Sequence, residues 1–415
     1  MRTKKKVIAS GLLAVGFSLL SYWITNMDIP LSGEHVVLYN FELVRQYLFP
    51  TPKIAPDSIL FVDVSYDKVF VPTYDKYGFV EGQRSITDRK KLVKLLQTLK
   101  QKNDYKYILL DVFFGDDVKT EDDSTLFHLI KTTPRLIIPR HEDAVLADSC
   151  LMEKSGMADY TTTYKFVTFS KYPYLPDGKV SMPLKMYEDV VHRKIKDWGI
   201  CYTDGWRLAR SSVILTQAVN INEPYDDNDT KVWFNLGADL LEDSVPGTHE
   251  VGNGLLWNRQ FTKNKYIVVG ALRSDANDQH TTYIGNLSGG VINMNAYIAL
   301  CKGQHIVSIP LMLIMLFVFF CLSYLTLSQQ GLKEVTAQMA QGRHWTLRIF
   351  LKVLSGLCTW IGYSLFMTIL CIVTYITIGE AYDIFITATF FSILNYIIKN
   401  IEYFKNIKLW NTKNK

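Results

Sequence analysis

The side chains best placed for chemistry in this 415-residue sequence are carboxylates at the ends of apolar runs. Asp63 and Asp111 each end such a run, Asp116 and Asp278 each follow one at a short distance, and Arg84 lies between the first two runs. The carboxyl ends of parallel strands form the crevice in which α/β sheets usually bind ligands. Facing carboxylates there would hold a hard cation or a polar ligand, and Arg84 would clamp an anion. We expect Asp63 and Asp111 to end adjacent strands.

A structural role explains the same residues and is the simpler interpretation. An Asp at the end of a strand caps the helix that follows it, or pairs with Arg84, without binding any ligand. Both interpretations stay open on the sequence alone.

Two further polar groups have weaker patterns. The spacing of an acidic loop lacks the central glycine of an EF-hand, so it predicts a solvated charge run at a helix N-terminus rather than a calcium site. The loop comprises Asp116, Asp117, Glu121, Asp122 and Asp123. Asp275, Asp278 and His280 suggest a metal or acid–base role, but a single histidine without a defined partner favours a polar surface loop. We therefore expect no metal and no cofactor.

The sequence has none of the common signatures of catalysis. It lacks a G-x-S-x-G elbow, a P-loop, a G-x-G-x-x-G after a strand and an H-E-x-x-H helix. We expect a protein that is not an enzyme and has no catalytic residues. A hydrolase that uses Asp63 and Asp111 is the lowest-ranked alternative.

The elements that position these side chains follow from the hydrophobic pattern. Residues 58–64 and 107–114 are continuous apolar runs typical of strands buried on both faces, and leucines at helical spacing predict a helix at 88–102 between them. Strand, helix and strand in this order predict a right-handed βαβ unit, and thus an α/β domain with a mostly parallel sheet. Residues 150–204 indicate a hairpin and loops. The remaining expected elements are helices at 33–48, 125–131, 206–219 and 289–302, and strands at 135–138, 231–235 and 266–270.

Four apolar stretches are long enough to cross a bilayer, so we expect one N-terminal and three C-terminal transmembrane helices. They are residues 7–25, 306–327, 353–378 and 381–398. A cleaved signal peptide is the alternative for the first, but no A-x-A-like site follows it.

Lys and Arg cluster in residues 1–6, 328–352 and 399–415, which places these segments in the cytoplasm and residues 26–305 outside it. The net charge of +5 reflects this topology, so we expect no nucleic-acid partner.

Three of the six cysteines lie in the exported segment. If two of them pair, Cys150 and Cys201 are the better match, because both lie in polar, loop-rich sequence. The spacing does not decide whether the bridge forms.

Several short motifs resemble the CHASE2 family. They occur in the family's order, in residues 58–63, 84–85, 108–114, 267–270 with Asp278, and 289–296. The chain departs from the family at Gly82-Gln83, where a tryptophan and a proline are usual. Asn293 and Val291 stand where a histidine and a glutamate are common, whereas Asn295 and Ala296 are retained.

This resemblance implies an extracytoplasmic sensory domain of a bacterial receptor, preceded by one span and followed by three, in the inner membrane. The ligand would be a small molecule or an envelope protein, and Asn295 joins Asp63, Arg84, Asp111, Asp116 and Asp278 as an expected ligand-binding residue. Because the sequence ends soon after the last apolar stretch, we expect a sensor module without its own output domain. It would signal through a cytoplasmic or membrane partner, or through a homo-oligomer in the lipid bilayer. The alternative is an envelope structural or assembly factor that binds proteins through its exported domain.

Overall fold

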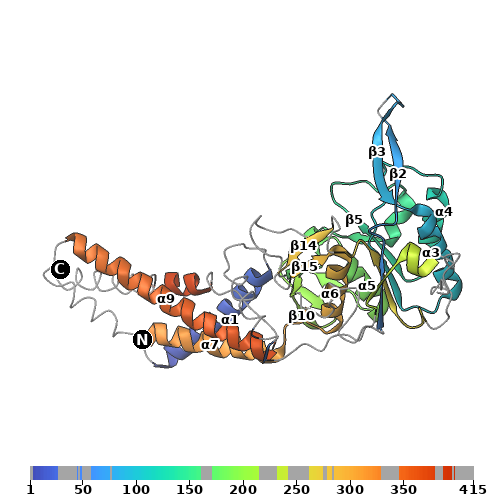
Figure 1. Cartoon of the computed structure of the whole chain (residues 1–415). Helices are drawn as coiled ribbons and strands as arrows, with labels where there is room; N and C mark the ends of the chain where they lie inside the picture. The colour runs from blue at the N-terminus through green and yellow to red at the C-terminus, as the bar shows by residue number, and fades with distance from the viewer. Residues whose placement is uncertain are drawn as a thin grey trace, which may run out of the picture. The chain divides into compact units, whose positions relative to one another are not determined.

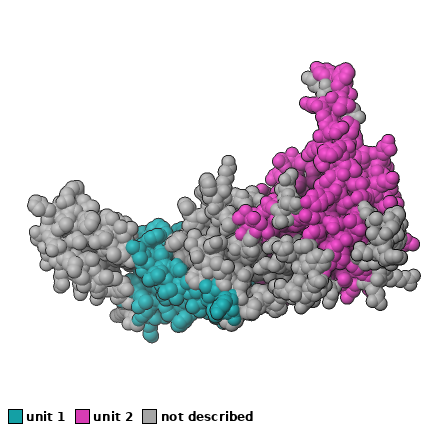
Figure 2. Space-filling view, in the orientation of Figure 1, with its two compact units in different colours: residues 1–49, 163–167, 306–415 teal, residues 50–162, 168–305 magenta. Residues whose placement is uncertain are grey.

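The computed structural model describes most of the chain. The described residues are 3–26, 44, 47–48, 58–74, 77–159, 171–214, 231–241, 261–273, 278–282, 285–328, 345–378, 387–394 and 397. The chain divides into two compact units, shown in Figure 2: residues 1–49, 163–167 and 306–415 form the first, and residues 50–162 and 168–305 the second.

A six-stranded sheet forms the centre of the second unit. All its strand pairings are parallel, which confirms the predicted mostly parallel sheet. The order is β12 (Trp233–Asn235), β1 (Ile59–Asp63), β13 (Tyr266–Gly270), β4 (Tyr107–Leu110), β5 (Leu136–Arg140) and β6 (Ser155–Met157).

The predicted adjacency of the strands that end at Asp63 and Asp111 is wrong. β13 lies between β1 and β4 and pairs with both. The order of strands along the chain does not give their order in the sheet, and a strand that follows much later in the sequence fills the central position. Gly270 of β13 therefore lies between the two aspartates, level with Asp63.

Helices cover both faces of the sheet (Figure 1). On one face, α3 (Arg89–Lys102) and α4 (Asp123–Thr132) pack on alternate strand residues such as Ile267 and Val269. On the other face, α5 (Met182–Val191) and α6 (Gly289–Cys301) lie against the strand residues in between, such as Val268. Gly290 of α6 is so near this strand that a Cβ added to it would be 3.2 Å from Val268 Cγ1. Strands covered on both sides are expected to be apolar over most of their length, as β13 and β4 are at every position.

Helix α3 confirms the predicted helix at 88–102 and shows why its ends are fixed. The Asp88 carboxylate accepts hydrogen bonds from the backbone N–H groups of Lys90 and Lys91 at the N-terminus. The helix ends at Asn103, which adopts the left-handed conformation (φ 48°) common at C-termini. Its leucine stripe is buried in the core.

A β-hairpin absent from the predicted elements joins β1 to α3. Strands β2 (Lys68–Tyr74) and β3 (Val80–Thr87) pair antiparallel, with a register shift at Thr73/Tyr74. Figure 1 and Figure 2 show the hairpin rising from the second unit, with its base beside the sheet.

The predicted helix at 206–219 is wrong over its described part. Residues 207–209 form β10 (Arg207–Ala209), which pairs with β9 (Tyr202–Asp204), and residues 212–214 form β11 (Ser212–Ile214), which pairs with β7 (Lys171–Pro173). Partner strands supply hydrogen bonds that a local helical pattern cannot reveal. Residues 215–219 lie outside the described residues.

The segment expected to hold a hairpin and loops also contains helix α5. Ser181 caps this helix through a bond from the Leu184 N–H, and Pro183 lies in its first turn. The remaining short elements are β8 (Ile195–Asp197), β14 (Gln279–Thr282), β15 (Gly285–Ser288), η2 (Ser149–Lys154), η3 (Pro176–Gly178) and η4 (Leu236–Leu241).

Among its described residues, the first unit contains three helices long and apolar enough to cross a membrane: α1 (Thr3–Asn26), α7 (Ile309–Ser328) and α9 (Trp345–Ile378). Within it, the Phe17 ring stacks on Phe391 at 4.1 Å and lies 6.1 Å from Phe319. The fourth predicted span, 381–398, is not clearly shown, because only residues 387–394 and 397 of it are described, all of them helical. The predicted helix at 33–48 lies almost wholly outside the described residues.

Cys150 and Cys201 are both free thiols, so the possible bridge between them is absent. Cys150 packs beside the core formed by α3 and α4, and Cys201 lies in the β8–β9 connection.

Candidate functional site

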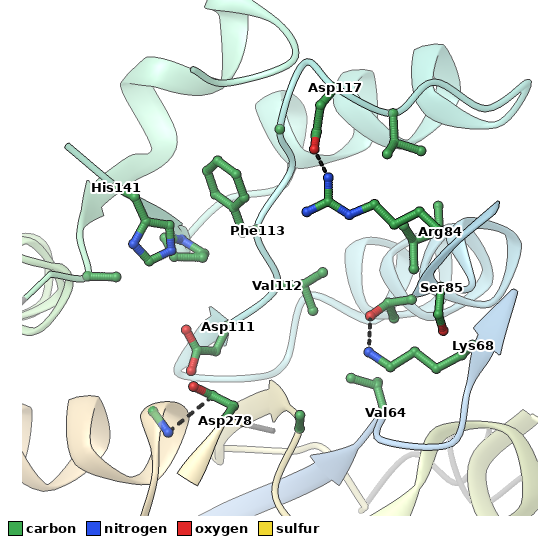
Figure 3. Close-up of a pocket in the computed structure, with 18 of the residues that line it drawn as sticks. Val64, Lys68, Arg84, Ser85, Asp111, Val112, Phe113, Asp117, His141 and Asp278 are labelled. Atoms are coloured by element: carbon green, nitrogen blue, oxygen red, sulfur yellow. Dashed lines mark hydrogen bonds and ion pairs between the residues drawn. The ribbon is translucent and has the colours of Figure 1, made fainter. Parts of the chain in front are cut away.

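A polar cavity of about 630 Å³ lies at the carboxyl ends of the strands. Its walls come from the turns after β1, β4 and β5, the base of the β2–β3 hairpin and the start of α6 (Figure 3). Arg84, Asp111 and Asp278, three of the predicted ligand-binding residues, line it together. The rule that ligands bind beyond the carboxyl ends of parallel strands thus places the cavity correctly.

Asp111 and Asp278, hereafter the acidic pair, point toward each other at the N-terminus of α6 (Figure 3). Asp278 accepts a hydrogen bond from the Gly289 N–H (3.2 Å), and its other oxygen lies 3.0 Å from His280 Nε2. Asp111 Oδ2 is buried and has no hydrogen-bond partner in the described part of the chain. A side chain at 289 would crowd both carboxyl groups, since a Cβ there would be 2.9 Å from Asp278 Oδ2 and 3.0 Å from Asp111 Oδ2.

The electrostatics of the acidic pair favour an uncharged Asp111. The pKa of Asp111 is raised to about 8. Burial of the carboxyl group is the larger cause, and the nearby Asp278 carboxylate is the second. Two like charges held this close together cannot both form at low cost, so the pair retains one proton near neutral pH.

Lys68 and Arg89, hereafter the basic wall, line the same cavity. The Lys68 ammonium donates to Thr87 Oγ1 (3.1 Å), and burial lowers the pKa of this ammonium against the attraction of the Asp63, Asp278 and Asp67 carboxylates. Arg89 is only 5% exposed and lies 4.5 Å from the centre of the Phe114 ring. Its Nε is 3.7 Å from Asp123 Oδ1, and its Nε and Nη1 have no hydrogen-bond partner among the described residues.

Two side-chain pairs line the outer part of the cavity, one an ion pair and one a histidine–carboxylate contact. Arg84, on β3, pairs with Asp117 after β4, and both side chains are about half exposed (Figure 3). His141 Nδ1 lies 2.6 Å from Asp159 Oδ1. Arg84 therefore has an acidic partner, but this partner is neither Asp63 nor Asp111.

Three predicted ligand-binding residues lie elsewhere. Asp63 is buried, and its Oδ1 accepts from Ser65 Oγ (2.5 Å) and the Leu272 N–H (2.9 Å), so it ties the end of β1 to the chain after β13. Asp116 is exposed and does not line the cavity. Asn295 is fully buried in α6, whereas Asn293 lines the cavity, because side chains two positions apart leave a helix on nearly opposite sides.

The Asp278–His280 segment also differs from the prediction. Both side chains line the cavity rather than a surface loop, because the Asp278 carboxylate is drawn to the N-terminus of α6. Asp275 lies outside the described residues.

Sequence reasoning missed Lys68, Arg89 and His141. His141 directly follows β5, so the strand-end rule that found Asp111 applies to it equally. Nothing local marks Lys68 or Arg89, because they reach the cavity only through the hairpin and the start of α3. No group of three or more His, Cys, Asp and Glu side chains placed to hold a metal occurs among the described residues.

The fold and the cavity define an α/β domain with a polar cavity at one edge of a parallel sheet, on a chain whose described part has three helices able to cross a membrane. Residues 38–327 match the family model of the CHASE2 domain, and the chain belongs to this family. This match confirms the resemblance seen in the sequence. CHASE2 is an extracytoplasmic sensory domain. No curated protein and no solved structure matches the chain.

Proposed function

We propose that this protein is a multi-pass sensor of a bacterial cytoplasmic membrane, and that its extracytoplasmic domain binds a small polar ligand in the cavity. The observation that carries this proposal is the buried, partnerless Oδ2 of Asp111, which faces Asp278 at the first turn of α6. An unsatisfied buried carboxylate oxygen destabilises the fold, and such a cost is typical of binding sites. The proposal includes no catalytic step.

Helix α6 is suited to transmit a change at the cavity. Residues 289–300 are all buried, so other parts of the domain pack around the whole helix. Tyr172 Oη donates a hydrogen bond to Asn293 Oδ1 (2.8 Å). The chain from its end at Cys301 to the start of α7 at Ile309 is short. A ligand that moves Gly289 would therefore shift the entry to α7, provided that it favours one of two packed arrangements.

The output is proposed to be a separate cytoplasmic or membrane partner, or a change between copies of this chain within the lipid bilayer. The segment between the second and third apolar stretches, 328–352, is too short to bury a core of its own.

Hydrogen exchange of the full-length protein in lipid nanodiscs tests the proposal. Addition of the low-molecular-mass fraction of spent growth medium is expected to slow exchange in α6 and in residues 302–308. Asp111→Asn should lose the effect, whereas Asp116→Asn, which alters an exposed carboxylate outside the cavity, should keep it. Unchanged exchange at residues 302–308 would refute transmission, and unchanged exchange throughout would refute sensing.

One observation favours the alternative, an envelope assembly factor. Large apolar side chains on and beside the β2–β3 hairpin are more than 60% exposed, as is typical of protein-binding surfaces. They are Tyr66, Phe70, Tyr77, Phe79 and Val80. If this surface binds an envelope protein, the double variant Phe70→Ser/Phe79→Ser should lose that protein on co-purification, while Trp206→Ser, at another exposed aromatic, should retain it.

A further inference from the structure

We propose that the ligand is a zwitterion, with an ammonium group held by the acidic pair and an acidic group held by the basic wall. This inference rests on the proposed function and names the chemical class of ligand. The cavity presents opposite charges on different walls: Asp111 and Asp278 at the start of α6, and Lys68 and Arg89 at the base of the hairpin and the start of α3. Figure 3 shows Lys68 reaching in from the side opposite the acidic pair.

The acidic pair suits an ammonium group better than an anion. A helix N-terminus usually attracts anions, but at α6 the Asp278 carboxylate already accepts from the Gly289 N–H. An anion would lie against the Asp278 carboxylate and the carboxyl oxygens of Asp111. An ammonium group donates three hydrogen bonds, and the buried Asp111 Oδ2 lacks a donor in the described part of the chain.

The basic wall supplies the complementary end. Arg89 is buried, and its nearest carboxylate, on Asp123, is engaged by the Thr120 N–H (3.0 Å) and Oγ1 (2.8 Å). The guanidinium Nε and Nη1 therefore lie buried without hydrogen-bond partners among the described residues. Leaving a buried carboxyl oxygen and two buried guanidinium nitrogens without hydrogen bonds costs free energy that one ligand with two charged ends would recover.

The acidic pair should exchange a proton for the ligand. The raised pKa of Asp111 keeps one proton on the pair near pH 7, and a bound ammonium group replaces that proton as the counter-charge. Binding should therefore release protons, which calorimetry detects as a heat that changes with the ionisation enthalpy of the buffer.

A series of ω-amino acids from glycine to 6-aminohexanoate tests the proposal on the full-length protein in nanodiscs. At the chain length that spans the two walls, the zwitterion should raise the melting temperature. The matching alkylamine, the matching alkanoate, Mg²⁺ and Ca²⁺, each supplied alone, should not. Asp111→Asn and Lys68→Met should each weaken binding by about tenfold or more, which corresponds to about 1.4 kcal/mol. Asp116→Asn should bind as the native protein does.

A further variant keeps every ionisable group of the acidic pair and the basic wall, and fills only the space beside Asp111 and Asp278. Gly289→Ala places a methyl group against both carboxylates and should also abolish binding. An equal shift with the amine alone, or with either metal alone, would show a simple cation site and overturn the proposal. So would a series in which no zwitterion binds. If spent medium still alters exchange in α6 in that case, the sensor function stands and only the ligand class is wrong.

Discussion

At the scale of single residues, Asp111 is the side chain whose ionisation should matter most. Its folded pKa of about 8 lies well above the value of about 3.9 expected in the unfolded chain. Between these values the folded state binds a proton that the unfolded state does not, so this contribution to stability is lost as the pH rises through about 8. Asn cannot ionise and removes the loss.

Asp111→Asn should therefore raise the melting temperature relative to the native protein, by more at pH 9 than at pH 5. A gain at pH 9 of about 3 kcal/mol or more is expected, because at that pH the native chain buries the charged Asp111 carboxylate whereas Asn stays neutral. Thermal unfolding across this pH range measures it, with Asp116→Asn as a control that shows no trend. A gain that shrinks as the pH rises would contradict the raised pKa.

Asp204 is a buried carboxylate that contacts His305, which lies just before α7. It is 2% exposed, and its Oδ2 accepts a hydrogen bond from Arg207 Nη2 (3.2 Å). The same oxygen lies 3.3 Å from His305 Nε2 and 3.3 Å from Tyr187 Oη. Burial lowers the pKa of His305, although the hydrogen bond and the charge of Asp204 oppose this. The imidazole is therefore mainly neutral near neutral pH, and its contact with Asp204 is a hydrogen bond rather than an ion pair.

Asp204→Ala should cost about 3 kcal/mol, because it leaves the buried ends of His305 and Tyr187 without their shared acceptor. Chemical denaturation would measure the loss. Asp143→Ala, at an exposed carboxylate, should change stability by less than about 0.5 kcal/mol. A loss for Asp204→Ala as small as this control would show that the pair has no structural role.

At the scale of elements, β6 packs backbone to backbone against the start of α5. The Met157 N–H donates to the Val180 carbonyl at 2.9 Å, which brings the strand alongside the residues that cap the helix. A Cβ on Gly156 would lie 2.8 Å from both the Cα and the backbone N of Met182. Backbone atoms cannot turn aside as a side chain can, so this contact explains why glycine stands here.

Gly156→Ala should destabilise the fold by about 1–3 kcal/mol, the range for overpacking in a close-packed interior. Gly82→Ala is the matched control, because its Cβ would lie 3.6 Å from the nearest atom, Thr73 Oγ1. Thermal unfolding of both variants decides the comparison. Equal stability would show that β6 and α5 separate freely.

Elements also show where sequence patterns succeed. The run before Asp63, the leucines of α3 and the run of β13 each carry a full local signal, because strands buried on both faces and amphipathic helices have distinct periods. The wrongly predicted helix at 206–219 has no such protection: its residues form short strands whose stability depends on β9 and β7.

At the scale of the whole molecule, the main expectation is the side of the membrane on which each segment lies. Trp206 is 86% exposed in the CHASE2 domain, so a membrane-impermeant maleimide should label Trp206→Cys in intact cells. Gln330→Cys, in the basic segment 328–352, should react only after permeabilisation. Labelling of the unaltered chain corrects for its own cysteines. The opposite pattern would reverse the proposed topology.

The sequence by itself determined the α/β class, the mostly parallel sheet and the family. It also located the apolar stretches, three of which are helices of membrane-spanning length in the described part of the chain. It also found Arg84, Asp111 and Asp278, because strand ends and apolar runs are local signals. Only the tertiary structure decided that β13 separates Asp63 from Asp111, that Asp63 and Asn295 are buried away from the cavity, and that Lys68 and Arg89 enter it. The physical reason is that strand order and side-chain burial arise from contacts between segments distant in sequence, which no local period encodes.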